Sequence, residues 1–446
     1  MDSPLDSQTN KKRVVRIGFQ NIFALLWIGT AGQIAWAVEN SWFNTFVFDR
    51  ITTNPQPVAW MVAVSAVTAM FTTLFMGILS DRTHGKWGMR KPYIVFGYIL
   101  WGIITAIYPM IEWVQNVGIA VVFVIITDAV MTFFGSTSND AAYNAWLKDI
   151  SHSSNRNRIQ SLVNITGYLA NAIAIVAAGV VIDKFGYFIF FYVLGGFVTL
   201  TGLIAVFLVP SAPIKRTELN NKQSYIKELK SLFKLSLLKE NSTLFLLFLN
   251  MAITGIASQV YMPYLLIFLE HYVGFSKTEL SGYMAVFIFV LIGAFLIIGA
   301  FSHKANRKPL VLWGSIIGSI VTIIMGVVSF NTALITSVKA TVFILYFLAT
   351  IPAITASIAH GGWLLDKYPE GDVGKFQGIR MLFMVLIPMV TGPFIGAAAI
   401  DKWGITVGIV SDIPTPHIFI IGGIISILAV IPILFIRKSE GKIDFD

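Results

Sequence analysis

A few ionisable side chains lie inside long apolar stretches of this sequence. The acids are Glu39, Asp128 and Asp140, and Arg380 is a base. A charge inside a bilayer is costly unless it faces a cavity or a partner, so each of these groups is a functional candidate. Burial favours the neutral form of a carboxyl group, so these acids could bind and release a proton. Arg380 could neutralise one acid or stabilise its ionised form.

Structural roles remain open for the same acids. Glu39 and Asp128 could each form a hydrogen bond that only joins two helices. Asp140 could belong to a charged network at the membrane edge instead. His360, a histidine inside an apolar stretch, is interpreted as a packing residue.

Polar and aromatic side chains follow one face of the first apolar stretch. Gln33, Trp36, Asn40 and Asn44 recur at helical spacing beside Glu39. Amides and carboxylates hydrogen-bond hydroxyl groups, and an indole covers the apolar face of a sugar ring. The stripe therefore predicts contacts with a sugar.

Two later stretches could also line this cavity. Asn164 and Tyr168 keep roughly one face of the fifth expected helix, and Gln259 and Tyr264 of the seventh could line the cavity opposite. Packing between helices explains these residues equally well.

These side chains need elements that place them in an apolar phase. The chain has 446 residues, of which 56% are hydrophobic and 12% charged, whereas a soluble domain carries roughly a quarter charged residues. A helix crosses a bilayer with about 20 apolar residues. We therefore expect an all-α membrane protein with twelve transmembrane helices. They are expected at 17–48, 57–79, 92–112, 117–147, 158–182, 187–209, 243–270, 279–301, 309–329, 340–365, 376–400 and 415–436.

The basic residues indicate how these helices are oriented. Lys and Arg in short loops accumulate on the cytoplasmic side of a membrane. With both termini inside, all but a few of the 32 Lys and Arg residues fall inside. Arg380 lies within a span, and the outside ones are Arg50, Lys184, Lys277, Lys339 and Lys402. The chain is thus predicted to have both termini in the cytoplasm, and its compact loops and short tails favour a plasma (inner) membrane.

The two halves of the chain share short sequence signatures. Arg90-Lys91-Pro92 recurs as Arg307-Lys308-Pro309, and Trp146 and Asp149 recur as Trp363 and Asp366, all 217 positions later. This repeat predicts two pseudo-symmetric six-helix bundles, at residues 1–209 and 243–446, with a cytoplasmic linker at 210–242. Parallel repeats of this kind are typical of secondary transporters, whose substrate site lies between the bundles.

The loop after the second expected helix carries a longer motif. It includes Gly77, Asp81, Arg82, Arg90 and a Lys-Pro pair. This motif resembles the signature loop of the major facilitator superfamily, in the form found in glycoside-pentoside-hexuronide:cation symporters and their sucrose-transporter relatives. The resemblance implies a cytoplasmic latch, in which Gly77 permits close helix packing and the charged groups pair across the inner face while the bundles are closed there.

A second segment is similar to the same symporters. In it Asp140 is followed by Tyr143, Asp149 and Arg158, and Tyr143 is a candidate substrate contact. Asp149 with Arg158, and Asp366 with Lys375, have the same nine-residue spacing in the two halves. Their symmetry indicates ion pairs of a gate or framework rather than substrate contacts.

Together these features predict a cation-coupled symporter of a sugar or glycoside. Sodium-coupled members of the group carry acidic residues in the second helix, whereas residues 57–79 contain none, so the proton is the expected coupling cation. Efflux of drugs or metabolites is the alternative within transport, although the amide-rich stripe argues against it. A non-transporting membrane sensor is a further alternative.

Other classes of protein fit the sequence poorly. It lacks the HExxH, GxSxG and Gly-rich phosphate motifs of common enzymes, and it contains no cysteine. We therefore expect no enzymatic activity, no cofactor and no metal. The net charge of +9 reflects topology and contact with anionic lipid, so no nucleic-acid partner is expected. A monomer is expected.

Overall fold

Most of the chain is helical in the computed structural model, which describes residues 18–83, 85–151, 156–211, 241–302, 306–368, 376 and 379–437. Eleven helices in this part are long and apolar enough to cross a membrane. One of them, Ile165–Leu208, passes through Gly186, whose φ of 79° and ψ of 172° are not helical. Glycine adopts this conformation without steric cost. Gly186 thus divides the segment into two spans, and the expected twelve spans are confirmed.

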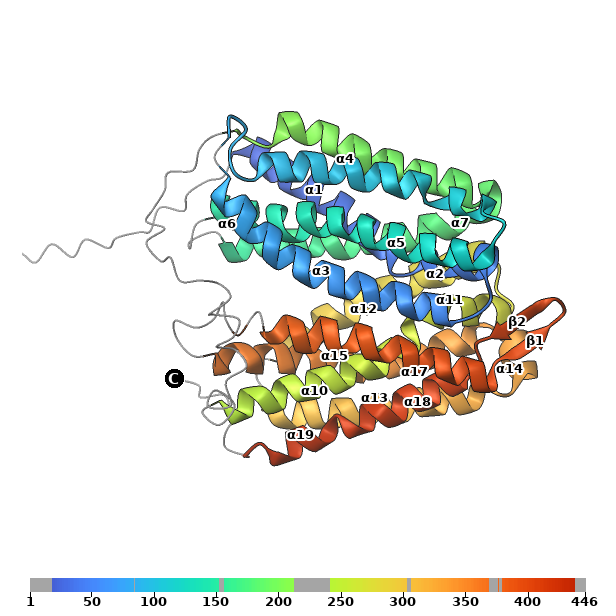
Figure 1. Cartoon of the computed structure of the whole chain (residues 1–446). Helices are drawn as coiled ribbons and strands as arrows, with labels where there is room; N and C mark the ends of the chain where they lie inside the picture. The colour runs from blue at the N-terminus through green and yellow to red at the C-terminus, as the bar shows by residue number, and fades with distance from the viewer. Residues whose placement is uncertain are drawn as a thin grey trace, which may run out of the picture.

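The first six spans form one bundle and the last six form another (Figure 1). The spans of the first bundle consist of helices that follow one another in the chain. In order they are α1 (Phe19–Glu39), α2 (Trp42–Phe46), η1 (Val47–Ile51), α3 (Gln56–Arg82), α4 (Lys91–Ile107), η2 (Tyr108–Trp113), α5 (Val117–Gly135), η3 (Ser136–Tyr143), α6 (Asn144–Ile150) and α7 (Arg156–Leu208).

The second bundle also contains two short β-strands. Its elements are α10 (Ser242–Gln259), η4 (Met262–Tyr264), α11 (Leu265–Ile267), η5 (Phe268–Tyr272), α12 (Lys277–Ser302), α13 (Arg307–Ser329), α14 (Thr332–Ser337), α15 (Ala340–Lys367), η6 (Leu382–Leu386), α17 (Ile387–Trp403), β1 (Ile405–Val407), β2 (Val410–Ile413), α18 (His417–Leu428) and α19 (Val430–Phe435).

The strands β1 and β2 form an antiparallel hairpin that the sequence did not predict. Val407 pairs with Val410 across a two-residue turn, in which Gly408 has a φ of 64°, as tight hairpin turns require. We call the end of the molecule that carries this hairpin the hairpin end. The opposite end, where α7 ends and α10 begins, is the linker end (Figure 1).

Several spans are interrupted where the sequence predicted continuous helices, and three of these interruptions lie beside expected site residues. The first breaks at Asn40 and Ser41, between α1 and α2. The fourth contains the π-helix η3 over Ser136–Tyr143, a distortion that is frequent at functional sites. The seventh breaks before η4, where Pro263 provides no backbone donor.

Close contacts between helices stabilise each bundle. At the crossing of α4 and α7, a Cβ on Gly102 would lie 2.4 Å from the carbonyl oxygen of Gly195, and a Cβ on Gly195 would lie 2.4 Å from that of Gly102. Small residues at such crossings let membrane helices approach closely. Large apolar side chains such as Phe71, Phe207 and Phe289 are exposed on the outer surface, as a lipid-facing surface requires.

Candidate functional site

Two buried carboxyl groups of the first bundle are joined by two hydroxyl groups. Glu39 at the end of α1 is 7% exposed, and Asp128 in α5 is 2% exposed. Thr132 Oγ1 lies 2.9 Å from Glu39 Oε1 and 3.1 Å from Ser65 Oγ. Ser65 Oγ in turn contacts Asp128 Oδ2. These four side chains, which we call the acid pair network, come from three spans.

The acid pair network needs one more hydrogen than its hydroxyl groups supply. Its three contacts require three hydrogens, whereas Ser65 and Thr132 provide one each. Among the described residues the remaining source is a protonated carboxyl group, because an ionised carboxylate only accepts hydrogen bonds. With one proton on Glu39, that carboxyl group donates to Thr132, Thr132 donates to Ser65, and Ser65 donates to Asp128. Reversing both hydroxyl groups moves the proton to Asp128, so the chain can carry one proton between two acids.

The acid pair network has no basic partner among the residues that the structure describes. Glu39 Oε2 and Asp128 Oδ1 are buried without a hydrogen-bond partner, so two buried negative charges would lack compensation. Arg380 does not supply the expected neutralising charge. It contacts Met384 one turn along its own helix and lies near His360 and Tyr368 in the second bundle.

Asp140 has a different environment in η3. Its carboxylate accepts hydrogen bonds from Ser136 Oγ at 3.0 Å and from Asn139 Nδ2 at 3.2 Å. Asn139 Oδ1 accepts one from Tyr98 at 3.0 Å. Both oxygens of Asp140 thus have donors, whereas each carboxyl group of the acid pair network has one oxygen without a hydrogen-bond partner, so Asp140 stands apart from that network.

The expected polar stripe of the first span is divided by the break at Asn40. Gln33 and Trp36 are partly exposed on α1, where Gln33 Oε1 accepts a hydrogen bond from Asn171 at 3.3 Å and Trp36 packs on Trp101. Asn40 donates a hydrogen bond to Trp36 O at 2.8 Å and ends the helix. Asn44 lies beyond the break, buried, and donates to Pro263 O at 3.1 Å. The expectation of one continuous stripe was therefore wrong.

Two tyrosines proposed as sugar contacts are engaged with the protein backbone. Tyr143 is 3% exposed and donates to Leu25 O at 2.8 Å. Tyr264 is 1% exposed and lies 3.2 Å from Pro55 O and 3.0 Å from Pro393 O. Gln259 packs closely on Gly392. The side chains of Asn164 and Tyr168 lie outside the described residues.

A cavity of about 430 Å³ lies within the second bundle, between α10, α13, α15 and α18. Hydroxyl groups are common in its wall, along with the ring of His360, whose Nε2 lies 3.0 Å from Leu247 O. No lysine, arginine or carboxylate lines it among the described residues. Such a volume suits a small neutral ligand. The hydroxyl-bearing lining residues include Thr254, Ser258, Ser315, Tyr346 and Ser357.

The proposed gate residues form ion pairs within each bundle, at the linker end. Arg90 contacts Asp81, Asp149 at 3.0 Å and Ser80 Oγ at 2.7 Å. In the second bundle Arg307 contacts Asp366. The pairs Arg90–Asp149 and Arg307–Asp366 are related by the repeat of 217 positions. The repeat is thus expressed as one ion pair in each half, within a bundle and not between bundles.

The expectation for Gly77 was wrong, and some of the other gate residues lie outside the part of the chain that the structure describes. A Cβ on Gly77 would meet nothing within 4 Å, so the expected close packing is not made in this conformation. Arg82 is exposed at the end of α3. The side chain of Arg158, the whole of Lys375 and most of the linker lie outside the described residues.

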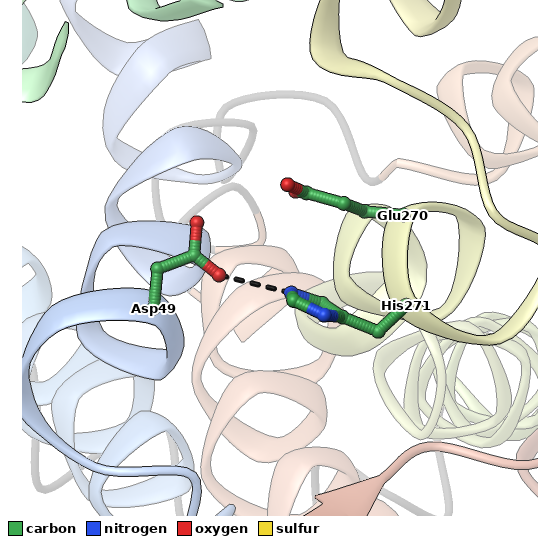
Figure 2. Close-up of side chains that lie close together, drawn as sticks. All are labelled: Asp49, Glu270 and His271. Atoms are coloured by element: carbon green, nitrogen blue, oxygen red, sulfur yellow. Dashed lines mark hydrogen bonds and ion pairs between the residues drawn. The ribbon is translucent and has the colours of Figure 1, made fainter. Parts of the chain in front are cut away.

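A charged cluster joins the two bundles at the hairpin end, and the sequence reasoning missed it. Asp49 of the first bundle lies 2.9 Å from His271 Nε2 and 2.8 Å from Lys277 Nζ, and Lys277 also contacts Glu270. Figure 2 shows Asp49 facing Glu270 and His271 from the opposite bundle. Tyr187 donates to Asp49 at 2.6 Å. These residues lie near helix ends, where charges are ordinary, so little in their sequence pattern marks them.

The described hydrogen bonds and ion pairs between the bundles all lie at the hairpin end. Besides this cluster they include Gln56 with Asp401 at 2.6 Å, and the amide of Thr278 with Asp183 at 2.7 Å. The structure is therefore closed at the hairpin end, while the described ion pairs of Arg90 and Arg307 at the linker end lie within their own bundles.

The family assignment comes from comparison with known proteins. The family model described as the Major Facilitator Superfamily matches residues 19–360 and 247–445. The chain belongs to this superfamily. Its fold agrees, because a nucleoside transporter, NupG, has a TM-score of 0.66 at 14% identity, over 93% of this chain and 98% of that one.

Two further similarities concern a solved structure and a protein of known sequence. A D-xylose–proton symporter has a TM-score of 0.68 at 14% identity, over 95% of this chain and 99% of that one. An "Uncharacterized transporter" of Buchnera aphidicola subsp. Schizaphis graminum (strain Sg) is 26% identical over 172 residues. That match spans 39% of this chain and 40% of the relative. The chain is thus a multi-pass helical membrane protein of this superfamily.

Proposed function

We propose that this protein is a proton-coupled symporter of a sugar or another small polyhydroxylated solute, working by alternating access. The acid pair network carries this proposal. Its three contacts are complete only with one proton on Glu39 or Asp128, and the described residues supply no base to replace that proton. A network of this kind can load a proton and release it as the exposed side changes.

The cavity of the second bundle supports the solute part of the proposal. A solute with several hydroxyl groups is both a donor and an acceptor, and it matches a wall of serine, threonine and tyrosine hydroxyl groups without a charge. A D-xylose–proton symporter and a nucleoside transporter share the fold, so both pentoses and nucleosides are reasonable test solutes.

The positions of charged groups support a gate at each end. With both termini in the cytoplasm of a plasma membrane, the hairpin end faces outward, and its inter-bundle contacts close the outer side. The Arg90 contacts with Asp81 and Asp149 would then prepare the cytoplasmic side of α3 for pairing with the second bundle in the opposite state. All of these groups belong to one chain, so a monomer is sufficient for the proposed mechanism.

The test is uptake of labelled solutes by the purified protein in proteoliposomes. A panel of disaccharides, glycosides, pentoses and nucleosides is offered under an inward proton gradient, an inward sodium gradient or no gradient. We expect accumulation of one class under the proton gradient alone. The four oxygen-bearing side chains of the acid pair network could also hold sodium, and accumulation under the sodium gradient alone would overturn the proton assignment.

Variants place the coupling step. Asp128→Asn and Glu39→Gln should abolish accumulation while leaving measurable exchange of unlabelled for labelled solute. Glu279→Gln is the matched control, because its side chain is exposed at the hairpin end and pairs with Lys339. Absence of uptake for the whole panel would favour efflux of a drug or metabolite instead.

A further inference from the structure

Three side chains of metal-binding type meet where the two bundles touch at the hairpin end. Asp49, Glu270 and His271 each offer one ligand atom, and these atoms lie within 4.8 Å of one another (Figure 2). Zn²⁺ binds histidine nitrogen and carboxylate oxygen at about 2.0–2.2 Å, so its ligands lie roughly 3–3.5 Å apart in a tetrahedral site. Small rotations of these side chains would therefore enclose a metal ion.

The contacts of the cluster leave ligand atoms available beside Lys277. The ammonium group of Lys277 contacts Asp49 Oδ2 and Glu270 Oε1. The other oxygen of Asp49, Oδ1, lies 2.9 Å from His271 Nε2, and Glu270 Oε2 is buried without a hydrogen-bond partner. Burial without a hydrogen-bond donor is unfavourable for a carboxylate oxygen, and a metal ion coordinated by Glu270 Oε2 would remove this cost.

We propose that Asp49, Glu270 and His271 form a binding site for a first-row divalent cation such as Zn²⁺. In this site Asp49 Oδ1, Glu270 Oε2 and His271 Nε2 are the protein ligands, and water completes the coordination. The imidazole binds through Nε2 and keeps its hydrogen on Nδ1. Lys277 stays on the remaining carboxylate oxygens and holds them in place.

A metal ion can reach this site from the hairpin end. A cavity of about 370 Å³ is lined by all three ligands and by Lys277, and Val410 of the hairpin borders it. Under the proposed orientation this cavity faces the outside of the cell. Metal ions in the external medium would thus enter without crossing the transport path.

The site exists only while the hairpin end is closed. Asp49 belongs to the first bundle, whereas Glu270 and His271 belong to the second, so opening the hairpin end separates the ligands. A ligand that binds one state stabilises it by the factor 1 + [L]/Kd. At a Zn²⁺ concentration 100 times the Kd, the equilibrium between the two states should shift about 100-fold toward closure. External Zn²⁺ should therefore act as an inhibitor that locks the outer side.

Direct binding tests the site without any assumption about the solute. Tag-free protein in detergent is titrated with Zn²⁺ by isothermal calorimetry, because a histidine tag would bind the metal itself. We expect one saturable site per chain. His271→Gln and, separately, Asp49→Asn should each weaken binding by at least about 100-fold, since even changes to the partners that orient a metal ligand cost 10- to 100-fold. Each variant is first shown to be monodisperse by size-exclusion chromatography.

A matched histidine provides the control. His417 also lies at the hairpin end, where it stacks on Trp403 at 4.8 Å between ring centroids, and it lies outside the proposed site. His417→Gln should leave the Kd unchanged. Absence of saturable binding to the wild type, or a Kd unaffected by both His271→Gln and Asp49→Asn, would overturn the proposal.

A distance measurement tests the coupling to closure. The chain contains no cysteine, so spin labels can be placed at Trp113→Cys and Ile409→Cys, which are exposed at the hairpin end, one in each bundle. In the labelled protein with no other change, Zn²⁺ should increase the population with a short distance between the two labels. In the same labelled protein carrying His271→Gln, the distance distribution should not change. Binding without any such shift would overturn the locking role. Neither experiment depends on proton coupling, so their failure is distinct from failure of the proposed function.

Discussion

Replacing Thr132 by valine removes the hydroxyl group that connects the two acids and keeps the shape of the side chain. The Glu39 contact at 2.9 Å and the Ser65 contact at 3.1 Å are both lost. Each hydrogen bond is worth about 1 kcal/mol net, so the path for proton transfer between the two acids loses about 2 kcal/mol of stabilisation. Since each 1.36 kcal/mol is a factor of ten in rate, proton-driven accumulation should fall about 30-fold.

The assay for Thr132→Val is accumulation in proteoliposomes under an inward proton gradient, compared with solute exchange without a gradient. Thr105→Val is the control, because Thr105 is also buried and its hydroxyl group bonds to Trp101 O of its own helix and to Met131 Sδ. We expect Thr105→Val to accumulate solute normally. Normal accumulation by Thr132→Val would refute the idea that the proton passes through the hydroxyl chain.

Two further predictions concern stability and packing. Arg90→Gln should lower the free energy of unfolding by about 2–3 kcal/mol, because it leaves charged partners unpaired. Arg307→Gln should cost about 1 kcal/mol or less, since its partner is 57% exposed; equal melting temperatures in detergent for the two variants would contradict this ranking. Gly396→Ala should lower the melting temperature sharply, because the new Cβ would lie 2.1 Å from Val260 O, whereas Gly77→Ala meets open space and should melt within about 1 °C of the wild type by the usual size of surface effects.

The architecture was largely predictable from the sequence. Long apolar runs define membrane helices, because a bilayer of fixed thickness requires spans of fixed length. The repeat of Arg90 as Arg307 and of Asp149 as Asp366 indicated two halves, and the structure adds that each arginine meets the acid of its own half. The division of the long α7 at Gly186 also agrees with the expected two spans.

The details of the candidate site were less predictable. Glu39 and Asp128 were recognisable as acids in apolar runs, but Ser65 and Thr132 resemble ordinary helix residues, and only the packing of three spans brings them together. Side-chain periodicity also assumes an unbroken helix. The break after Asn40 rotates the rest of the span, so a regular helical projection misplaces residues such as Asn44.

The cluster around Asp49 was missed for a related reason. Its residues come from helix ends far apart in the chain, and only their contacts across the bundles distinguish them from solvated charges. A sequence pattern reports neighbours along one helix, whereas this cluster depends on how two rigid bodies meet.

The acid pair network and the hydroxyl-lined cavity lie in different bundles of this protein. Under the proposed function, residues of the first half couple transport to the proton gradient. Residues of the second half largely determine which solute is bound. Mutations around Thr254, Ser315 or Ser357 would then change which solute is transported without disturbing proton coupling. Descendants of such a gene should diverge faster in the lining of their second half than around Glu39 and Asp128, and exchange of second halves between relatives should be a productive route to new carriers.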